Sequence, residues 1–353
     1  MILSTIPMWH YCQIRGFNAF IYLYMMNIKR YKFCNYGFRV GYFLSGKVDF
    51  RKQENYSRLC FHSHLDQGNS TVKGRIDSHN ITTMATVAPK PCFLTPTPVK
   101  LDSPLFIYLP GMDGTGELLQ TQTPQLAKGL DIRCLSIPRN NLTTWDVLTQ
   151  NVLDLIHAEL EQSSQRPIYL CGESFGGCLA MKVAVQSPQL FKRMILINPA
   201  SALQQHPWFN WITQITNFVP SSLFNIGALG LLPFLASLER ISQSDRLMLL
   251  TAMRSLPSAT VNWRLSLLRD FQIDAKELQR LTHPVLLIGS GSDRLLPSVT
   301  EIARLVDILP HTQTCILPNS GHACLLEENV NLYQILKNYD FLAINKYLSK
   351  AKC

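Results

Sequence analysis

The stretch IYLCGESFGGCLAMKVA, residues 168–184, sets a serine among glycines at the point where an apolar run gives way to helical spacing. A continuous apolar run that ends at a turn is typical of a buried parallel strand, and the helix-like residues after Ser174 stop at Pro188. The pattern G-x-S-x-G at such a turn indicates a nucleophilic serine. We expect Gly172 and Gly176 to be required because strand and helix approach too closely there for side chains.

The turn also predicts one half of an oxyanion hole. Its strain projects the hydroxyl of Ser174 into solvent, and the start of the following helix offers free N–H groups and a positive dipole end. The N–H of Phe175 then points to where a carbonyl oxygen becomes negative. A chance G-x-S-x-G occurs in about one chain of this size in ten. The signal therefore rests on the strand before it and the helix after it.

Two later strand ends supply the partners that a serine hydroxyl needs. The run LLIGSGSDRLLP ends a strand just before Asp293, and CILPNSGHACLLEE places His322 after the next strand and before a helix. Acid and histidine follow this serine turn in that order, and such sheets carry their active sites at the carboxyl ends of strands. The alternatives are a turn role for Asp293 and a helix cap for His322, with Asp307 as the next acid. The other histidines of this region lie in a helix, in an inserted region or at the opposite end of the sheet: His157, His206, His283 and His311.

The loop after an earlier strand, in FIYLPGMDGTGELL, predicts the second oxyanion donor. Gly111 follows the strand, so the N–H of Met112 would face the serine. Asp113 is either a ligand residue or, as we favour beside Gly114, a turn residue. No G-K-[ST] follows, which excludes a phosphate loop, and no Cys/His group has zinc spacing. We expect neither a metal nor an organic cofactor.

The regular part of the chain predicts an α/β fold with a mostly parallel central sheet, flanking helices and an inserted helical cap. Apolar runs predict strands at 105–109, 132–137, 167–171, 193–198, 284–289 and 314–318. Helical spacing spans 141–162. No strand signal occurs between Asn198 and Val285, so we expect a helical cap over about 201–275.

The N-terminal arm differs from the rest. The chain carries a formal charge of +9, but most of the excess Lys and Arg lies in 1–83, so we expect no nucleic-acid partner. This arm is either a poorly ordered extension, with a possible hairpin at 37–50, or translated sequence upstream of a native start at Met84. We expect the folded domain to cover 84–345.

No Asp, Glu, Lys or Arg occurs from Met194 to Leu238. The stretch predicts an apolar substrate pocket, the cap's own core, or shallow docking on a membrane face. No run is long enough for a membrane span. The ten cysteines contain no C-x-x-C pair, which favours a reduced, cytoplasmic location, with peripheral membrane contact as an option. The oligomeric state stays open.

From about 104 to 340 the chain resembles an α/β-hydrolase. More narrowly, LPGMDGTG and CGESFGG resemble the hydrolase half of the plant and cyanobacterial phytyl ester synthase and diacylglycerol-acyltransferase-like proteins. The resemblance implies a serine esterase or lipase-like enzyme acting on lipid acyl esters. Pro110 stands where lipases often carry His, and no His has Asp five residues on, so the family's acyltransferase motif is absent. Hydrolysis is favoured, with formation of phytyl or wax-type esters, thioester or peptide cleavage, and a non-catalytic binding protein as alternatives.

Overall fold

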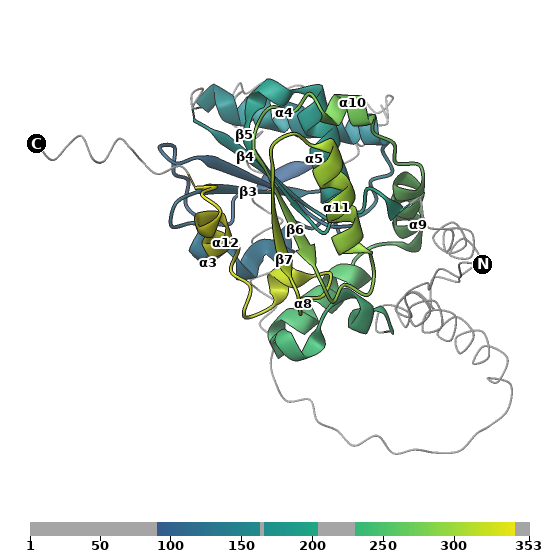
Figure 1. The fold of residues 1–353 in the computed structure, drawn as a ribbon. Coiled ribbons are helices and arrows are strands. Elements are labelled where there is room, and N and C mark those ends of the chain that lie inside the picture. Colours follow the sequence, from purple (N-terminus) through teal and green to yellow (C-terminus); the bar gives the residue numbers. More distant parts are fainter. Residues whose placement is uncertain (1–89, 163–165, 204–229, 343–353) are drawn as a thin grey trace, which may run out of the picture. The chain divides into compact units, whose positions relative to one another are not determined.

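The structure is a computed structural model of the 353-residue chain. It describes residues 90–162, 166–203 and 230–342, so the arm at 1–83, the possible hairpin and Met84 lie outside the described residues. Within these ranges the strands form one sheet in the order β1-β3-β2-β4-β5-β6-β7 (Figure 1). The strands are β1 (Cys92–Leu94), β2 (Leu105–Leu109), β3 (Asp131–Ser136), β4 (Ile168–Glu173), β5 (Phe191–Ile197), β6 (Val285–Ser290) and β7 (Thr312–Leu317).

The sheet is parallel except at one edge, where β1 pairs with β3 in the antiparallel sense. The predicted α/β fold class is confirmed, and the six predicted strands lie within two residues of their expected positions. Strand β1 was not predicted, because three residues beside a proline-rich segment are too few to show the alternation of a strand. In register, Phe93 of β1 lies opposite Leu135 of β3.

Helices cover both faces of the sheet. They are α3 (Thr123–Leu126), α4 (Trp145–Gln162), α5 (Phe175–Gln186), α8 (Gln243–Arg254), α9 (Ser258–Arg269), α10 (Ala275–Leu278), α11 (Ser298–Ile308) and α12 (Leu332–Asn338). Short 3-10 turns are η1 (Glu117–Thr121), η2 (Pro188–Leu190), η4 (Leu238–Arg240) and η5 (Cys324–Leu326). None of the helices in the described ranges is long and apolar enough to cross a bilayer.

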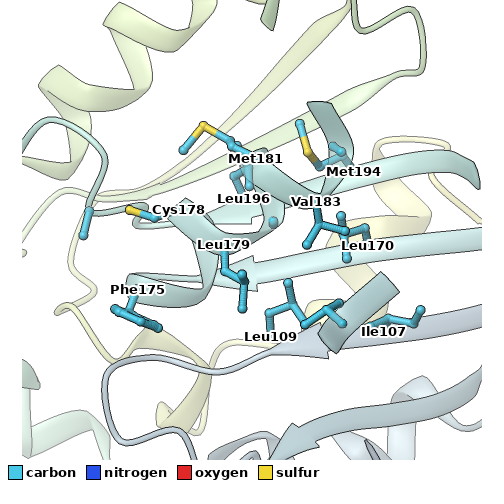
Figure 2. Packing of buried hydrophobic residues seen from close by; sticks show 14 of the residues in the cluster. Ile107, Leu109, Leu170, Phe175, Cys178, Leu179, Met181, Val183, Met194 and Leu196 are labelled. Carbon is cyan, nitrogen blue, oxygen red and sulfur yellow. The ribbon is translucent and has the colours of Figure 1, made fainter. Parts of the chain in front are cut away.

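Alternation along the strands divides the core into two layers. Leu170 and Leu196 face α5, and in Figure 2 they lie opposite Leu179 and Val183 of that helix. The intervening strand residues face the opposite layer, which α3 and α12 cover. Because successive side chains on a strand point to opposite faces, strands that are buried on both sides read as continuous apolar runs.

The described part of the segment between β5 and β6 contains helices and no strand. It contains residues 230–235, η4, α8, α9 and α10, while residues 204–229 lie outside the described part. The predicted cap boundaries and the predicted domain limits therefore stay predictions. The uncharged stretch is described only at its two ends.

Candidate active site

Ser174 lies on a strained turn between β4 and α5. Its φ of 53° and ψ of −113° fall outside the regions that a side chain normally permits. The N–H of Ser174 donates to the carbonyl of Ile197 at 2.9 Å, and the N–H of Ala200 donates to the carbonyl of Ser174 at 3.2 Å. The chain after β5 thus holds the serine backbone from both sides and maintains the strained conformation.

The glycines around the serine sit where backbone segments touch. A Cβ on Gly172 would lie 2.3 Å from the carbonyl oxygen of Gly176, and one on Gly176 would lie 2.0 Å from that of Leu109. Gly177 is similar, because its Cβ would lie 2.8 Å from the Cβ of Pro199. These distances are shorter than carbon and oxygen atoms tolerate, so only glycine allows α5 to start this close to β2 and β4.

A line of hydrogen bonds joins three side chains from three strand ends. His322 Nε2 lies 2.9 Å from Ser174 Oγ, and His322 Nδ1 lies 2.7 Å from Asp293 Oδ2. Ser174 follows β4, Asp293 follows β6 and His322 follows β7. Because these strands are parallel, their carboxyl ends share one edge of the sheet, and residues far apart in the chain meet there.

Four donors hold the carboxylate of Asp293. Its Oδ1 accepts from the N–H groups of Leu295 at 2.8 Å and Leu296 at 2.9 Å. Its Oδ2 accepts from the hydroxyl of Ser298 as well as from His322. Burial raises the pKa of Asp293, but the charge and hydrogen bonds of these partners outweigh it, so the pKa lies below its ordinary value. The group is a carboxylate at neutral pH.

The carboxylates of Asp293 and Glu173 both act on the pKa of His322. Burial lowers its pKa, but the attraction and hydrogen bond of Asp293, and then the attraction of Glu173, raise it above the ordinary histidine value. Glu173 is buried, and the hydroxyl of Tyr108 donates to its Oε2. Burial raises the pKa of Glu173 to about 7 although Tyr108 and His322 oppose the rise. The pKa of the residue beside the serine therefore lies well above that of an ordinary carboxyl.

Asn198 links the end of β5 to the His322 turn. It is fully buried and has a φ of 44°, in the left-handed region that asparagine tolerates. Its Nδ2 donates to the carbonyl of His322 at 2.7 Å, and its Oδ1 accepts from the N–H of Ser290 at 2.8 Å. This amide ties three neighbouring strand ends together.

The two predicted oxyanion donors lie at the start of α5 and in the loop after β2. Among the described residues, neither the N–H of Met112 nor that of Phe175 donates to another backbone group. The carbonyl of Met112 accepts from Arg264 at 2.6 Å, which anchors this loop to α9. Asp113 lies in a turn, since its Oδ2 accepts from the N–H and the hydroxyl of Thr115 at 2.9 and 2.6 Å.

Arg264 is the residue that the sequence analysis most clearly overlooked. It is only 2% exposed, and a Cβ on Gly114 would lie 2.5 Å from its guanidinium nitrogen. Burial lowers its pKa to about 10, although Asp113 attracts the charge. The available signal was its position on the buried stripe of α9 with Thr260 and Leu267, where an arginine is unexpected.

A small recess with a volume of about 10 Å³ lies between the loops after β5 and β6. Its lining, apart from Glu301, is apolar: Pro199, Ala200, Ala202, Leu203, Leu296 and Pro297. None of Ser174, Asp293 and His322 lines it. Among the described residues, no group of three His, Cys, Asp or Glu side chains has the arrangement to hold a metal ion. The site brings a serine hydroxyl, an imidazole and a carboxylate into hydrogen-bond contact.

A family model and several curated proteins match the chain. A family model described as serine aminopeptidase, S33, matches residues 137–329. The chain is 32% identical over 259 residues to phytyl ester synthase 1, chloroplastic, of Arabidopsis thaliana, with 67% of this chain and 37% of that protein covered. It is 25% identical over 251 residues to a putative carbamate hydrolase, RutD, of Stutzerimonas stutzeri, covering 67% and 92%. The chain therefore spans little more than a third of the length of the phytyl ester synthase that it matches.

Solved structures share the fold. A thermophilic esterase from Thermogutta terrifontis superposes with a TM-score of 0.58 at 16% identity, covering 71% of this chain and 93% of that one. An esterase from Exiguobacterium antarcticum gives 0.57 at 14% identity, covering 70% and 94%. Because the family model spans more than half of the sequence, the chain belongs to the serine aminopeptidase S33 family of α/β-hydrolases and is an enzyme of the esterase and hydrolase type.

Proposed function

We propose that the chain is a serine esterase that cleaves carboxylic esters with long acyl chains through an acyl-enzyme on Ser174. The observation that carries the proposal is the line of hydrogen bonds from Ser174 Oγ through His322 to Asp293, at 2.9 and 2.7 Å. The spacing lets one proton move along an existing contact when the serine attacks.

In acylation, Oγ of Ser174 bonds to the ester carbonyl carbon while Nε2 of His322 takes the hydroxyl proton. Asp293 holds the proton on Nδ1 and stabilises the imidazolium. The carbonyl oxygen becomes negative against the N–H groups of Met112 and Phe175. The bond to the alcohol oxygen then breaks, and His322 returns its proton to the departing alcohol.

In deacylation, water takes the place of the alcohol. His322 removes a proton from the water, the hydroxide oxygen bonds to the acyl carbon, and the bond to Ser174 Oγ breaks as the serine regains a proton. The products are the carboxylic acid and the free enzyme. The raised pKa of His322 places the acid limb of this reaction above pH 6.5, since only the neutral imidazole accepts a proton.

Two observations support a lipid ester as the substrate. The chain between Met194 and Leu238 has no charged side chain. The matched relatives include phytyl ester synthases, whose product joins a long alcohol to an acyl group. Substrates of this kind reside in lipid, so we place the enzyme at a lipid–water boundary, with the inserted segment over about 201–275 as the cap.

A second candidate is transfer of the acyl group to a long-chain alcohol instead of water. The names of the phytyl ester synthases favour it. It requires only that an alcohol enter the site in place of water, since the same base removes a proton from either. The chain covers 37% of those proteins, so the second activity is tested separately from hydrolysis.

The nucleophile is tested with a fluorophosphonate probe. Wild type should take up one label, and Ser174→Ala should take up none, with Ser187→Ala, at the opposite end of α5, as the matched control. Labelling that persists in Ser174→Ala would place the nucleophile elsewhere.

The substrate is tested with p-nitrophenyl esters of increasing acyl length. Each buried methylene contributes about 0.8 kcal/mol, so kcat/KM should rise several-fold per two carbons until the site is full. Leu231→Asp, within the uncharged stretch, should flatten this dependence, whereas Leu247→Asp on exposed α8 should not.

Acyl thioesters and aminoacyl p-nitroanilides in the same panel separate the rival substrate classes, and added phytol reveals transfer as a new ester. A profile that peaks at acetyl would contradict the lipid substrate. Faster cleavage of the anilides would favour a peptidase.

A further inference from the structure

The turn that carries His322 is hydrogen-bonded to the inserted segment. The N–H of Ala323, the next residue, donates to the carbonyl of Leu235 at 2.7 Å. Five residues on, the N–H of Glu328 donates to the carbonyl of Arg240 at 3.0 Å, and Ile241 forms an antiparallel bridge with Glu327. The described end of the segment therefore pairs with the chain on the C-terminal side of the histidine.

Glu327 lies at the centre of this contact. Its side chain is fully buried, and its Oε1 accepts from the N–H of Gly321 at 2.8 Å. Its Oε2 accepts from the hydroxyl of Ser320 at 2.9 Å and from Nε of Arg240 at 2.6 Å. The first two donors belong to the residues immediately before His322, and the third belongs to the inserted segment.

The packing around this pair leaves little freedom. A Cβ on Gly321 would lie 2.6 Å from the backbone nitrogen of Ser237, so segment and turn are in backbone contact. A small apolar cluster seals the contact, with Ala236, Ile241 and Leu249 from the segment and Ala323 and Leu326 from the turn. The histidine is thus held from the sheet by Asn198, at its carbonyl, and from the segment by Arg240, which acts through Glu327.

We infer that Arg240 and Glu327 are positioning residues, whose ion pair makes the inserted segment part of the machinery that aligns His322 with Ser174. The inference rests on the proposed role of His322 as the base and deepens it, because it assigns the segment a share in the rate of proton transfer. A buried carboxylate that loses its cation is strongly destabilised. It then turns toward water and releases the N–H of Gly321 and the hydroxyl of Ser320.

Because of this geometry, loss of the ion pair between Arg240 and Glu327 should slow catalysis and leave substrate binding unchanged. The donors that Glu327 holds, the hydroxyl of Ser320 and the N–H of Gly321, belong to the two residues directly before His322. A displacement of about 1 Å in a catalytic group costs on the order of 100-fold in rate. We therefore expect kcat to fall and KM to stay, which distinguishes alignment of the base from a role of the segment in holding the acyl chain.

The experiment compares Arg240→Ala, Arg240→Lys, Glu327→Gln and the Arg240→Ala/Glu327→Gln double variant in the full chain. The matched control is Arg269→Ala, which removes an exposed arginine from an ion pair with Asp270. Readouts are kcat and KM with p-nitrophenyl butyrate, the rate of fluorophosphonate labelling of Ser174, and the melting temperature.

Arg240→Ala should lower kcat and the labelling rate together, by on the order of 100-fold, with KM within about twofold of wild type. Arg240→Lys should keep much of the wild-type rate because it supplies a positive charge. The double variant should be no slower than Arg240→Ala, because its two substitutions remove the same ion pair. Arg269→Ala should match wild type. If Arg240→Ala does not fold, Glu327→Gln, which removes the charge that pairs with Arg240 but keeps an acceptor for Gly321, should lower kcat as well, by a smaller factor.

The outcomes separate the inference from the proposed function. If Ser174 still labels and the folded variants keep wild-type kcat, the coupling is wrong while the serine esterase stands. A rise in KM with unchanged kcat would show that the segment acts on binding alone, which also overturns the inference. If Ser174 does not label in wild type, His322 has no serine to activate, and both fail.

Discussion

Asp293→Asn should disable the site by putting the histidine proton on the wrong nitrogen. Both oxygens of the Asp293 carboxylate accept hydrogen bonds. In asparagine one of the two is replaced by an NH₂ group, which can only donate. With its oxygen toward the N–H groups of Leu295 and Leu296, at 2.8 and 2.9 Å, it keeps both hydrogen bonds. The flipped orientation sets an NH₂ donor against those two donors, and each unsatisfied buried group costs about 1–3 kcal/mol. The NH₂ group therefore faces His322 and donates to its Nδ1.

A donor on that side reverses the tautomer. The ring proton moves to Nε2, which lies 2.9 Å from Ser174 Oγ, so the imidazole has no lone pair to accept the serine proton. The corresponding change in a serine protease triad lowers kcat by about 10⁴. At 1.36 kcal/mol for each tenfold, the loss of transition-state stabilisation is about 5 kcal/mol.

The assay is kcat with p-nitrophenyl butyrate together with the rate of fluorophosphonate labelling, which reports serine activation without turnover. The matched control is Asp307→Asn, because Asp307 is an exposed residue of α11 and the next aspartate in the chain. We expect the control to keep wild-type rates. A value for Asp293→Asn within tenfold of wild type would refute the tautomer argument, and a large loss in the control would move the acid to Asp307.

Three further changes test other parts of the site. Glu173→Gln should move the acid limb of the kcat/KM profile to lower pH, because Glu173 raises the pKa of His322; an unmoved limb would show that the two groups do not interact. Ser174→Gly should melt higher than Ser174→Ala while both are inactive, since glycine accepts a φ of 53° without strain of about 1–3 kcal/mol; equal melting temperatures would contradict a strained turn. Asp131→Ala should lower the free energy of unfolding by about 3 kcal/mol in a urea titration, because it leaves Arg133 and Arg166 buried with one partner fewer, and a change under 1 kcal/mol would show that the network is dispensable.

The parts of the fold that the sequence predicts are those with local signals. The serine turn is readable because Gly172, Ser174 and Gly176 are close in sequence and flanked by a strand and a helix. Asp293 and His322 are readable because each follows an apolar strand at the carboxyl end. Strands β2 to β6 are readable because burial on both faces produces continuous apolar runs, whereas the edge strand β7 is mostly exposed and shows only a short run.

The remaining parts depend on contacts between distant residues, for which the sequence carries no local signal. Arg264 binds the carbonyl of Met112, 152 residues away in the chain, and Asn198 binds that of His322 across 124 residues. Arg240 and Glu327 look like ordinary surface charges until the backbone brings them together. Strand β1 has no periodicity to detect, and its pairing with β3 appears only in the folded chain.

The central claim is that Ser174 carries the acyl group during turnover. Wild-type protein mixed with p-nitrophenyl octanoate and quenched in acid within milliseconds should gain the mass of one octanoyl group. Peptide mapping should then place that group on the segment that contains Ser174, and the adduct should accumulate in a burst equal to the enzyme concentration if deacylation is slow. An octanoyl group on another residue would contradict the account. So would turnover during which Ser174 stays unmodified, together with a Ser174→Ala variant that keeps the wild-type rate.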